Sequence, residues 1–410
     1  MGAEERKGAE DQTGRQEVKE FFQKSFGNTP AQVVRAPGRL ELLGNHTDYN
    51  GGLVMALAVD KYIYIAASPR NDAQIELVST SFDTREKFWL DKIEKNPAAP
   101  WANYLKGVLL KLRERGVHFT GFNAAVHGTI PFGAGLSSSA ALEMATALIV
   151  RALFPYRLNE NSLDAAPRRE DGKLPLLTAA EKLRIAKIGQ AAESQFVGAN
   201  VGLLDQMSSL FGKAGHVVQI DFLDHSVKHD PMPPGVAVVV ADSAVKHDLS
   251  AGEYNELREH CESAARKLAV KFLRQVDPKQ LEVQKGKLTE REYQCAFHVV
   301  GENQRVVFGE RALREGDIYQ FGQYLFQSHA SSRDYFKNST KELDALVECA
   351  KKLKGCYGAR LTGGGFGGAT INLVQADAVE EFQRRLAEEY YAKMKIRTEP
   401  WVAKVVDGAE

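Results

Sequence analysis

The chain has 410 residues, which is more than one hydrophobic core usually supports, so we expect two domains or two closely joined lobes. Its 53 basic and 53 acidic residues balance and form no long block of one sign, which leaves a role in binding nucleic acid or a membrane surface without support. The four cysteines form no CxxC pair, which suggests a reducing compartment. No apolar run approaches the ~20 residues of a membrane span, and the charged N-terminus lacks the apolar region of a signal peptide. The sequence therefore predicts a cytoplasmic globular protein.

The first half of the chain alternates strand-like and helix-like segments. Residues 1–18 are predicted to be largely a flexible tail, and "EVKEFFQKSFG" is predicted to form an amphipathic helix that ends at Gly27. The best-marked later helix starts at Thr178 and Glu181, which have the spacing of a capping box. The predicted strands are 31–39, 52–70, 75–82, 87–90 and 121–132, and the predicted helices are 101–116, 133–154 and 178–196.

The second half begins after one more predicted helix, at 203–212. Strands at 216–222 and 235–242 precede a largely helical region between residues 251 and 353. A strand–glycine loop–strand pattern at 358–374, a helix and a strand near 399–406 close the chain. Because both halves mix strands and helices, we predict an α+β fold with an N-terminal lobe at 19–212, a C-terminal lobe at 213–410 and a cleft between them.

The segment "GRLELLGNHTDYNGG" (38–52) is too polar for a core strand and too rich in glycine for a helix. It presents Arg39, Asn45, His46 and Asp48 together. An arginine that neutralises charge, beside side chains that donate or accept hydrogen bonds, indicates a binding site for a polar ligand.

The segment "PFGAGLSSSAAL" (131–142) is typical of an anion-binding loop. Gly133 and Gly135 allow close approach of the backbone to a ligand, and the following helix directs free N–H groups and its positive dipole end at an anion. Ser137, Ser138 and Ser139 add hydroxyl groups for phosphate oxygens or magnesium. No lysine follows the glycines, so this is not a Walker A loop, and a well-capped helix without a ligand is the alternative.

A third segment, "LTGGGFGGAT" (361–370), places five glycines between strand-like flanks. So many glycines weaken a strand, which favours close approach of the backbone to a ligand or to the other lobe over an ordinary wide hairpin.

Two carboxylates lie on either side of the glycine-interrupted turn in "AAESQFVGANVGLLDQ". Glu193 is predicted near the end of one helix and Asp205 at the start of the next, so the turn can bring both acids into one cleft. Phosphoryl transfer needs a magnesium ligand, a group that orients or deprotonates the attacking hydroxyl, and a cation, and Glu193, Asp205 and Arg39 could supply them. A solvated Glu193 and an Asp205 placed only to suit the helix dipole are the alternative.

The three glycine-rich segments, in this order and spacing, resemble the three motifs of the GHMP small-molecule kinases. The first is similar to the galactokinase signature, GRxNLIGEHTDYNxG, and blocks such as "PWANYLKGV" and "HVVGENQRV" extend the resemblance from about Val33 to Ala403. The resemblance implies a lobe like ribosomal protein S5 followed by a ferredoxin-like lobe, with ATP and Mg²⁺ bound between them. It also implies phosphorylation of the anomeric hydroxyl of galactose, and we expect a monomer or weak oligomer.

The resemblance also implies individual roles. Arg39 matches the charge stabiliser and Asp205 the presumed base, although the sequence leaves open whether a proton is removed by Asp205. Ser139 and Glu193 match the magnesium ligands. The positions that match sugar contacts are Asn45, His46, Asp48, Gly202 and Tyr254. The positions that match ATP contacts are Gly133, Ala134, Gly135, Leu136, Ser137, Ser138, Ser139 and Trp101.

The signature departs from the family pattern at two positions. Asn45 stands where the family has Glu, and Glu41 stands where it has Asn. In an extended strand Glu41 would lie roughly 13 Å from Asn45, so we expect no compensation between them. The favoured substrate is still galactose. The alternatives are a sugar with a modified C6 group, such as galacturonate, which the usual Glu would repel, or a non-catalytic galactose sensor. The intact "GLSSSAAL" loop favours an enzyme over a sensor, and "HTDYNGG" disfavours kinases of homoserine or mevalonate.

Overall fold

A long antiparallel strand pair organises the N-terminal part of the molecule. The computed structural model describes residues 3–131, 133–159, 163–166, 168–170, 172–246 and 251–410. Among these residues, seven strands form one sheet, in which β1 (Gln32–Leu43) pairs with β2 (Leu53–Pro69). Neighbouring strands of the sheet follow the order β4 (Arg85–Trp89), β3 (Gln74–Ser79), β5 (Phe122–Gly128), β2, β8 (His216–Asp221) and β9 (Ser226–Pro231). Strand β1 pairs with β2 outside this order.

Strands β8 and β9 correct the predicted lobe boundary. The sequence predicts that the C-terminal lobe begins at residue 213, but β8 pairs with β2 in register Leu53↔Asp221 and β9 pairs with β8. The chain also returns to this sheet at its end, where the Glu410 backbone exchanges hydrogen bonds with Arg35 of β1. A boundary at residue 212 therefore separates strands that share one sheet.

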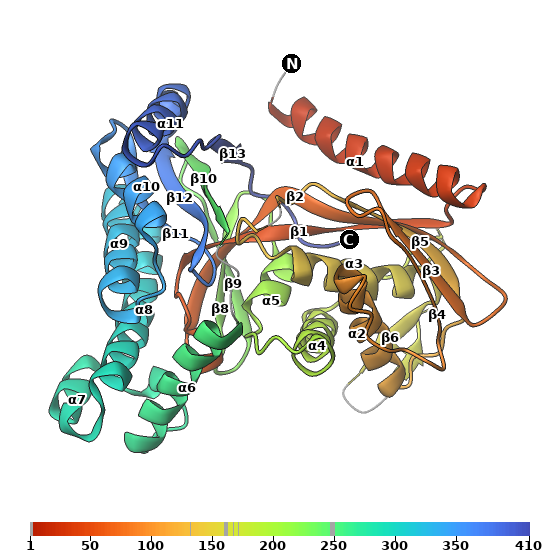
Figure 1. Ribbon diagram of the computed structural model, residues 1–410, viewed down its shortest axis with the longest axis horizontal. Coiled ribbons are helices and arrows are strands. Elements are labelled where there is room, and N and C mark those ends of the chain that lie inside the picture. The colour runs from red at the N-terminus through yellow and green to blue at the C-terminus, as the bar shows by residue number, and fades with distance from the viewer. Residues whose placement is uncertain (1–2, 132, 160–162, 167, 171, 247–250) are drawn as a thin grey trace.

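Helices cover both faces of this sheet (Figure 1). Helix α1 (Ala3–Phe26) lies across one face, where Val18 and Phe22 pack against Tyr64 of β2. The predicted tail up to residue 18 is therefore helical from Ala3, and the ion pair between Asp11 and Arg35 of β1 fastens that end of the helix. The helices on the opposite face are α2 (Pro100–Glu114), α3 (Ser138–Leu153), α4 (Ala179–Ala191) and α5 (Leu204–Phe211).

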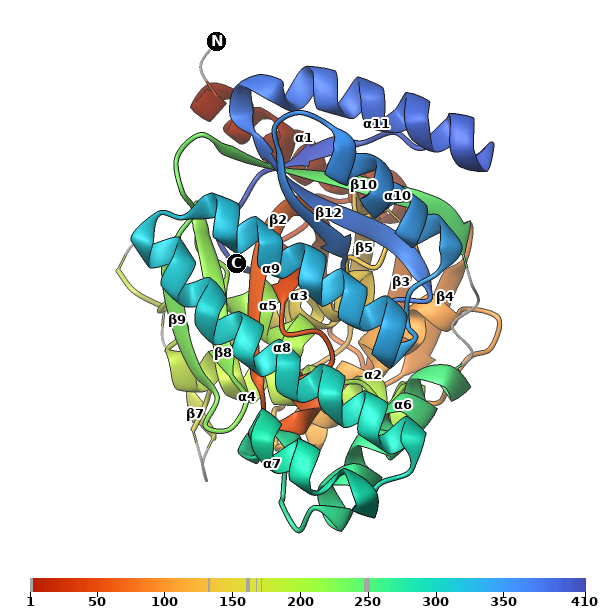
Figure 2. The ribbon, with the colours of Figure 1, turned by 90° about the vertical axis from the view of Figure 1, so that its left-hand side faces the viewer.

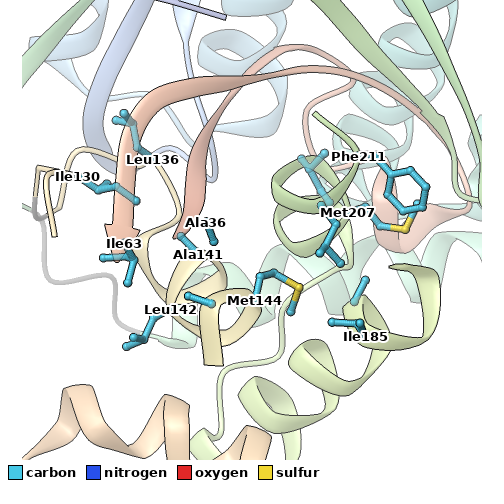
Figure 3. Close-up of a cluster of buried hydrophobic side chains, with 14 of the residues drawn as sticks. Ala36, Ile63, Ile130, Leu136, Ala141, Leu142, Met144, Ile185, Met207 and Phe211 are labelled. Atoms are coloured by element: carbon cyan, nitrogen blue, oxygen red, sulfur yellow. The ribbon is translucent and has the colours of Figure 1, made fainter. Parts of the chain in front are cut away.

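A buried core joins these helices to the sheet (Figure 3). Met144 of α3, Ile185 of α4 and Met207 of α5 belong to one cluster with residues of β1 and β2. Leu136, which precedes α3, lies in the same cluster near Ile130. Helix α4 has the predicted capping box and then widens into one π-helical turn, Ala192–Val197. A small hairpin, β6 (Tyr156–Leu158) and β7 (Leu163–Ala165), follows α3.

The C-terminal lobe is built on a second sheet (Figure 2). Within the described part of the chain it has the strand order β11 (Cys356–Leu361), β12 (Gly367–Gln375), β10 (Val236–Lys246) and β13 (Trp401–Ala403). Helices α10 (Lys341–Lys352) and α11 (Val379–Met394) pack on it through apolar residues such as Leu346 and Leu386. The remaining helices are α6 (Ala251–Lys267), α7 (Pro278–Val283), α8 (Glu290–Glu315) and α9 (Ile318–Ser331). No helix in the described ranges has both the length and the apolar character to span a membrane.

Candidate active site

The three glycine-rich segments, which are far apart in sequence, meet at one cavity of about 670 Å³ between the two sheets. The turn after β1, the loop before α3 and the loop between β11 and β12 all line it, together with the start of α5. The predicted site residues in its lining are Arg39, Asn45, His46, Asp48, Gly133, Gly135, Leu136, Ser137, Ser138, Ser139, Glu193, Gly202, Asp205 and Tyr254. The predicted convergence is thus present in the structure.

Backbone geometry at the end of β1 folds the first segment over the cavity. The register with β2 shifts between Glu41 and Leu43, and the backbone then takes positive φ angles of 96° at Gly44 and 58° at His46. A Cβ at Gly44 would lie 2.3 Å from the carbonyl oxygen of Leu53, so only glycine fits there. Glu302 of α8 holds the turn, because its Oε2 accepts hydrogen bonds from the backbone N–H groups of Gly44 and Asn45 at 2.9 and 3.1 Å.

Arg39 and Asp205 form the polar centre of the cavity. Arg39 Nε and Nη2 lie 2.9 and 2.8 Å from Asp205 Oδ1, and Arg39 is 5% exposed. Arg39 Nη1 also donates to the carbonyl oxygen of Gly135, and the Ser137 hydroxyl donates to Asp205 Oδ2 at 2.5 Å. These contacts join the first segment, the loop before α3 and α5, so a cation and a carboxylate face one another at the point where all three meet.

The loop before α3 exposes backbone groups to the cavity and buries its apolar side chains. Gly133, Gly135 and Ser137 have φ angles of 75°, 70° and 58°, which turn the chain sharply into the helix. Leu136 is 1% exposed, and its carbonyl oxygen accepts a hydrogen bond from the Arg39 backbone N–H. Ser137 occupies the N-cap position but donates to Asp205 and makes no capping hydrogen bond in the described structure, which differs from the expected serine cap.

The glycine loop between β11 and β12 approaches the loop before α3 closely. A Cβ at Gly363 would lie 2.9 Å from the Gly135 carbonyl oxygen, and one at Gly368 would lie 3.2 Å from the Ala134 carbonyl carbon. Both residues also have positive φ angles, 76° and 79°. The close approach expected for these glycines is therefore made to the N-terminal lobe, and the loop lines the cavity as well.

Glu193 and Ser139 are placed so that they can share one ligand. The π-helical turn after α4 carries Glu193, which is 5% exposed, and Ser139 is close enough to hydrogen-bond its carboxylate. Burial and the neighbouring Asp205 raise the pKa of Glu193 to about 7. Gln206 Nε2 donates to Glu193 Oε2 at 3.0 Å and to Glu143 Oε2 at 2.9 Å. Burial raises the pKa of Glu143 well above its ordinary range, and the neighbouring Glu193 adds to the rise.

This donor set is compatible with magnesium. A carboxylate and a hydroxyl are hard oxygen ligands, and Mg²⁺ is usually held by one or two carboxylates plus substrate phosphates and water. Within the described residues, no group of three or more His, Cys, Asp or Glu side chains could hold a metal by itself.

His46 and Asp48 line the end of the cavity next to α6. His46 Nε2 lies 3.0 Å from the Gly364 carbonyl oxygen, which can only accept, so Nε2 carries the proton and Nδ1 accepts from the Tyr49 hydroxyl at 2.9 Å. Burial lowers the pKa of His46 to about 4, so its ring is neutral at pH 7. Both ring nitrogens are thus already engaged within the protein, and the ring packs 5.1 Å from that of Tyr254.

Asp48 lies against the backbone of Gly202. A Cβ at Gly202 would lie only 1.5 Å from Asp48 Oδ2, so residue 202 has to be glycine if the carboxylate is to keep its place. Burial and the charge of Asp205 raise the pKa of Asp48 to about 6. At pH 7 most of the Asp48 carboxylate is therefore an ionised hydrogen-bond acceptor.

The expectation that Glu41 and Asn45 lie too far apart to interact is wrong. Asn45 Nδ2 donates to Glu41 Oε1 at 3.0 Å, because the bulge and the two positive φ angles turn the chain back on itself. The distance expected for an extended strand does not apply, because β1 ends at Leu43, between Glu41 and Asn45. Arg360 of β11 completes the group, with Nη1 3.1 Å from Glu41 Oε1. Burial raises the pKa of Glu41, and the Arg360 guanidinium opposes the rise.

Two residues predicted to contact ATP are not among the residues that line the cavity. Trp101 is 7% exposed, its ring stacks on Phe82 at 5.8 Å, its Nε1 donates to Thr84, and it does not line the cavity. Ala134 is 2% exposed and also lies outside the cavity lining. Several buried residues that support the site are not predicted from the sequence. These residues are Glu143, Gln206, Glu302, Asn338 and Arg360.

Comparison with known proteins assigns the chain to a family. Residues 20–69 match the galactokinase galactose-binding signature, residues 103–169 the GHMP kinases N terminal domain and residues 310–392 the GHMP kinases C terminal domain. A galactokinase of Roseiflexus sp. (strain RS-1) is 40% identical over 397 residues, which cover 96% of both chains. The chain belongs to the galactokinase family.

Other members of the galactokinase family agree with this assignment. The galactokinase of Chloroflexus aurantiacus is 38% identical over 392 residues, or 94% of this chain and 95% of that one. The crystal structure of Lactococcus lactis galactokinase complexed with galactose has a TM-score of 0.87 and 29% identity, covering 96% of this chain and 98% of that chain. A mevalonate kinase structure, at 17% identity and a TM-score of 0.58, shares the fold alone. The predicted two-lobed GHMP kinase fold is confirmed.

Proposed function

We propose that this chain transfers the γ-phosphoryl group of ATP to the anomeric hydroxyl of galactose, giving galactose 1-phosphate and ADP. The observation that carries this proposal is the pairing of Arg39 with Asp205 where the galactose-binding signature meets the serine-rich loop. Transfer of a phosphoryl group depends mostly on positioning and on charge stabilisation. A buried arginine and an adjacent carboxylate at this junction supply both.

Each lobe contributes to the proposed reaction. The backbone N–H groups before α3 and the positive end of that helix bind the phosphates, and Arg39 neutralises the charge that develops on the transferred group. Asp205 orients the anomeric hydroxyl and accepts its proton. Asp48 accepts hydrogen bonds from other sugar hydroxyls, and Tyr254 covers the sugar from α6.

Magnesium has a place in this proposal. Ser139 and Glu193 would hold the ion against the ATP phosphates, where it would neutralise phosphate charge. Glu193 must lose its proton to act as a ligand, and the rise of its pKa to about 7 predicts that magnesium binding releases protons in neutral solution.

The proposed setting is the cytoplasm, and the proposed state is a monomer or weak oligomer that binds no nucleic acid. All four cysteines are free thiols, which supports a reducing compartment. The balance of 53 acidic and 53 basic residues supports the absence of a nucleic-acid partner.

A panel of sugars tests the proposal. ADP release is measured with ATP, Mg²⁺ and galactose, galacturonate, N-acetylgalactosamine, glucose or fucose, with Asp205→Ala as the inactive control. Turnover that depends on galactose and is lost in the variant is expected. Galactose binding without turnover would identify a sensor, and a preference for galacturonate would replace the substrate.

A further inference from the structure

Glu41 is a buried carboxylate in the cavity wall for which the proposed reaction has no use so far. Glu41 is 2% exposed and lines the cavity. Two donors, Asn45 Nδ2 and Arg360 Nη1, bind the same oxygen, Oε1, at 3.0 and 3.1 Å. The other oxygen, Oε2, accepts no hydrogen bond from any residue that the structure describes.

Asn45, in contrast, has no hydrogen-bonding capacity left. Its Nδ2 donates to Glu41 and to the Gly363 carbonyl oxygen at 2.8 Å. Its Oδ1 accepts from Asn338 Nδ2 at 2.9 Å and from the Ser332 hydroxyl at 3.3 Å. An amide offers two donors and two acceptor positions, and all four are taken. Asn45 lines the cavity, but its amide has no free donor or acceptor for a sugar hydroxyl, so it acts as a support for Glu41.

We propose that Glu41 determines sugar specificity, by accepting through Oε2 a hydrogen bond from one neutral sugar hydroxyl, and that Asn45 and Arg360 position its carboxylate. This inference rests on the proposed function. The hydroxyl is not the anomeric one, because that group faces Asp205 and Arg39. Since the family has Asn at position 41 and Glu at position 45, the chain retains one carboxylate and one amide with their places exchanged.

The same geometry disfavours an acidic sugar. A hexuronate would bring a second carboxylate against Glu41 in a buried wall where Arg360 is paired with Glu41 and the nearby Arg39 is paired with Asp205. Within this proposal, the absence of the usual Glu at position 45 does not by itself open the site to galacturonate, because Glu41 places a carboxylate beside that position.

Glu41→Gln is the most direct test. Arg360 and the Asn45 amide nitrogen both donate to Oε1, so the glutamine has to keep its oxygen there and turn its NH₂ group toward the cavity. The acceptor at Oε2 then becomes a donor. We expect KM for galactose to rise about tenfold or more while KM for ATP stays unchanged. Glu381→Gln, on the exposed side of α11, is the matched control and should behave like the wild type.

A set of deoxygalactoses distinguishes recognition from mere support of the fold. kcat/KM is measured for galactose and its 2-, 3-, 4- and 6-deoxy forms in the wild type and in Glu41→Gln. If Glu41 binds one hydroxyl, removal of that hydroxyl costs activity in the wild type and costs much less in the variant, at one position only. A uniform loss over the whole series would overturn the proposal.

Two measurements decide the question even if Glu41→Gln does not fold. Calorimetry with the wild type should give a Kd for galacturonate at least about tenfold above that for galactose, and equal values would overturn the proposal. Asn45→Glu places two carboxylates side by side and should raise KM for galactose. A lower KM would show that residue 45 itself contacts the sugar.

The binding constants from calorimetry test the role of Glu41 independently of whether the protein phosphorylates galactose. If the wild type binds galactose but does not phosphorylate it, the proposed reaction fails and the Glu41 comparison is still decided by the binding constants. If it binds neither sugar, both proposals fail.

Discussion

Gly202→Ala is expected to damage sugar use without affecting nucleotide binding. The added Cβ would lie 1.5 Å from Asp48 Oδ2 and 2.3 Å from its Cγ. Non-bonded heavy atoms pack at about 3.5 Å, so the carboxylate has to retreat by about 2 Å. A displacement of about 1 Å at a reacting site can cost about 100-fold in rate, so kcat/KM for galactose should fall by at least that factor, which corresponds to about 2.7 kcal/mol.

The assay is release of ADP with galactose and ATP varied in turn. KM for ATP should stay within about twofold of the wild type, because Gly202 meets Asp48 and not the loop before α3. Gly286→Ala is the control, since its Cβ would meet nothing within 4 Å. A Gly202→Ala protein with the wild-type KM and kcat for galactose would refute the assignment of Asp48 to the sugar.

Three further outcomes can be measured with the same protein. Asp205→Ala should abolish turnover and leave ATP binding, measured by calorimetry, nearly intact; retained turnover would remove Asp205 from the mechanism. Since burial raises the pKa of Asp48 to about 6, and the ionised carboxylate is the better acceptor, the affinity for galactose should increase as pH rises through about 6. Asp48→Asn should flatten that profile, and an unchanged profile in the variant would assign the titration to another group. Phe22→Ala should lower the free energy of unfolding in urea by about 3 kcal/mol with kcat unchanged, because Phe22 of α1 is fully buried against the sheet; a stability equal to that of the wild type would contradict the packing of α1 on the sheet.

The roles of the glycine-rich and polar segments can be predicted from the sequence, because they depend on the chemistry of neighbouring residues. The convergence of the first segment, the loop before α3 and the loop after β11 on one cavity is what their resemblance to the GHMP kinase motifs implies, while the glycines themselves indicate only close approach of the backbone. The capping box at Thr178 and Glu181 is likewise a local pattern, and the structure confirms it.

Contacts that depend on a bend or on a distant partner are not predictable in this way. The contact between Glu41 and Asn45 arises from a bulge and positive φ angles, which strand periodicity cannot anticipate. The N-terminal part of α1 is held by contacts with residues far along the chain, such as Arg35 with Asp11, and a polar local sequence gives no sign of them. Strand β9 is an edge strand with few buried residues, so it lacks the apolar run by which strands are recognised.

Identification of the product is the most direct test of the proposed phosphorylation of galactose at its anomeric hydroxyl. The protein is incubated with ATP, Mg²⁺ and galactose labelled with ¹³C at C1, and the mixture is followed by ³¹P NMR. Phosphorylation at the anomeric hydroxyl predicts one new phosphate signal that is coupled to the labelled carbon and appears in step with ADP. A phosphate ester without that coupling, or ADP release that does not depend on galactose, would contradict it.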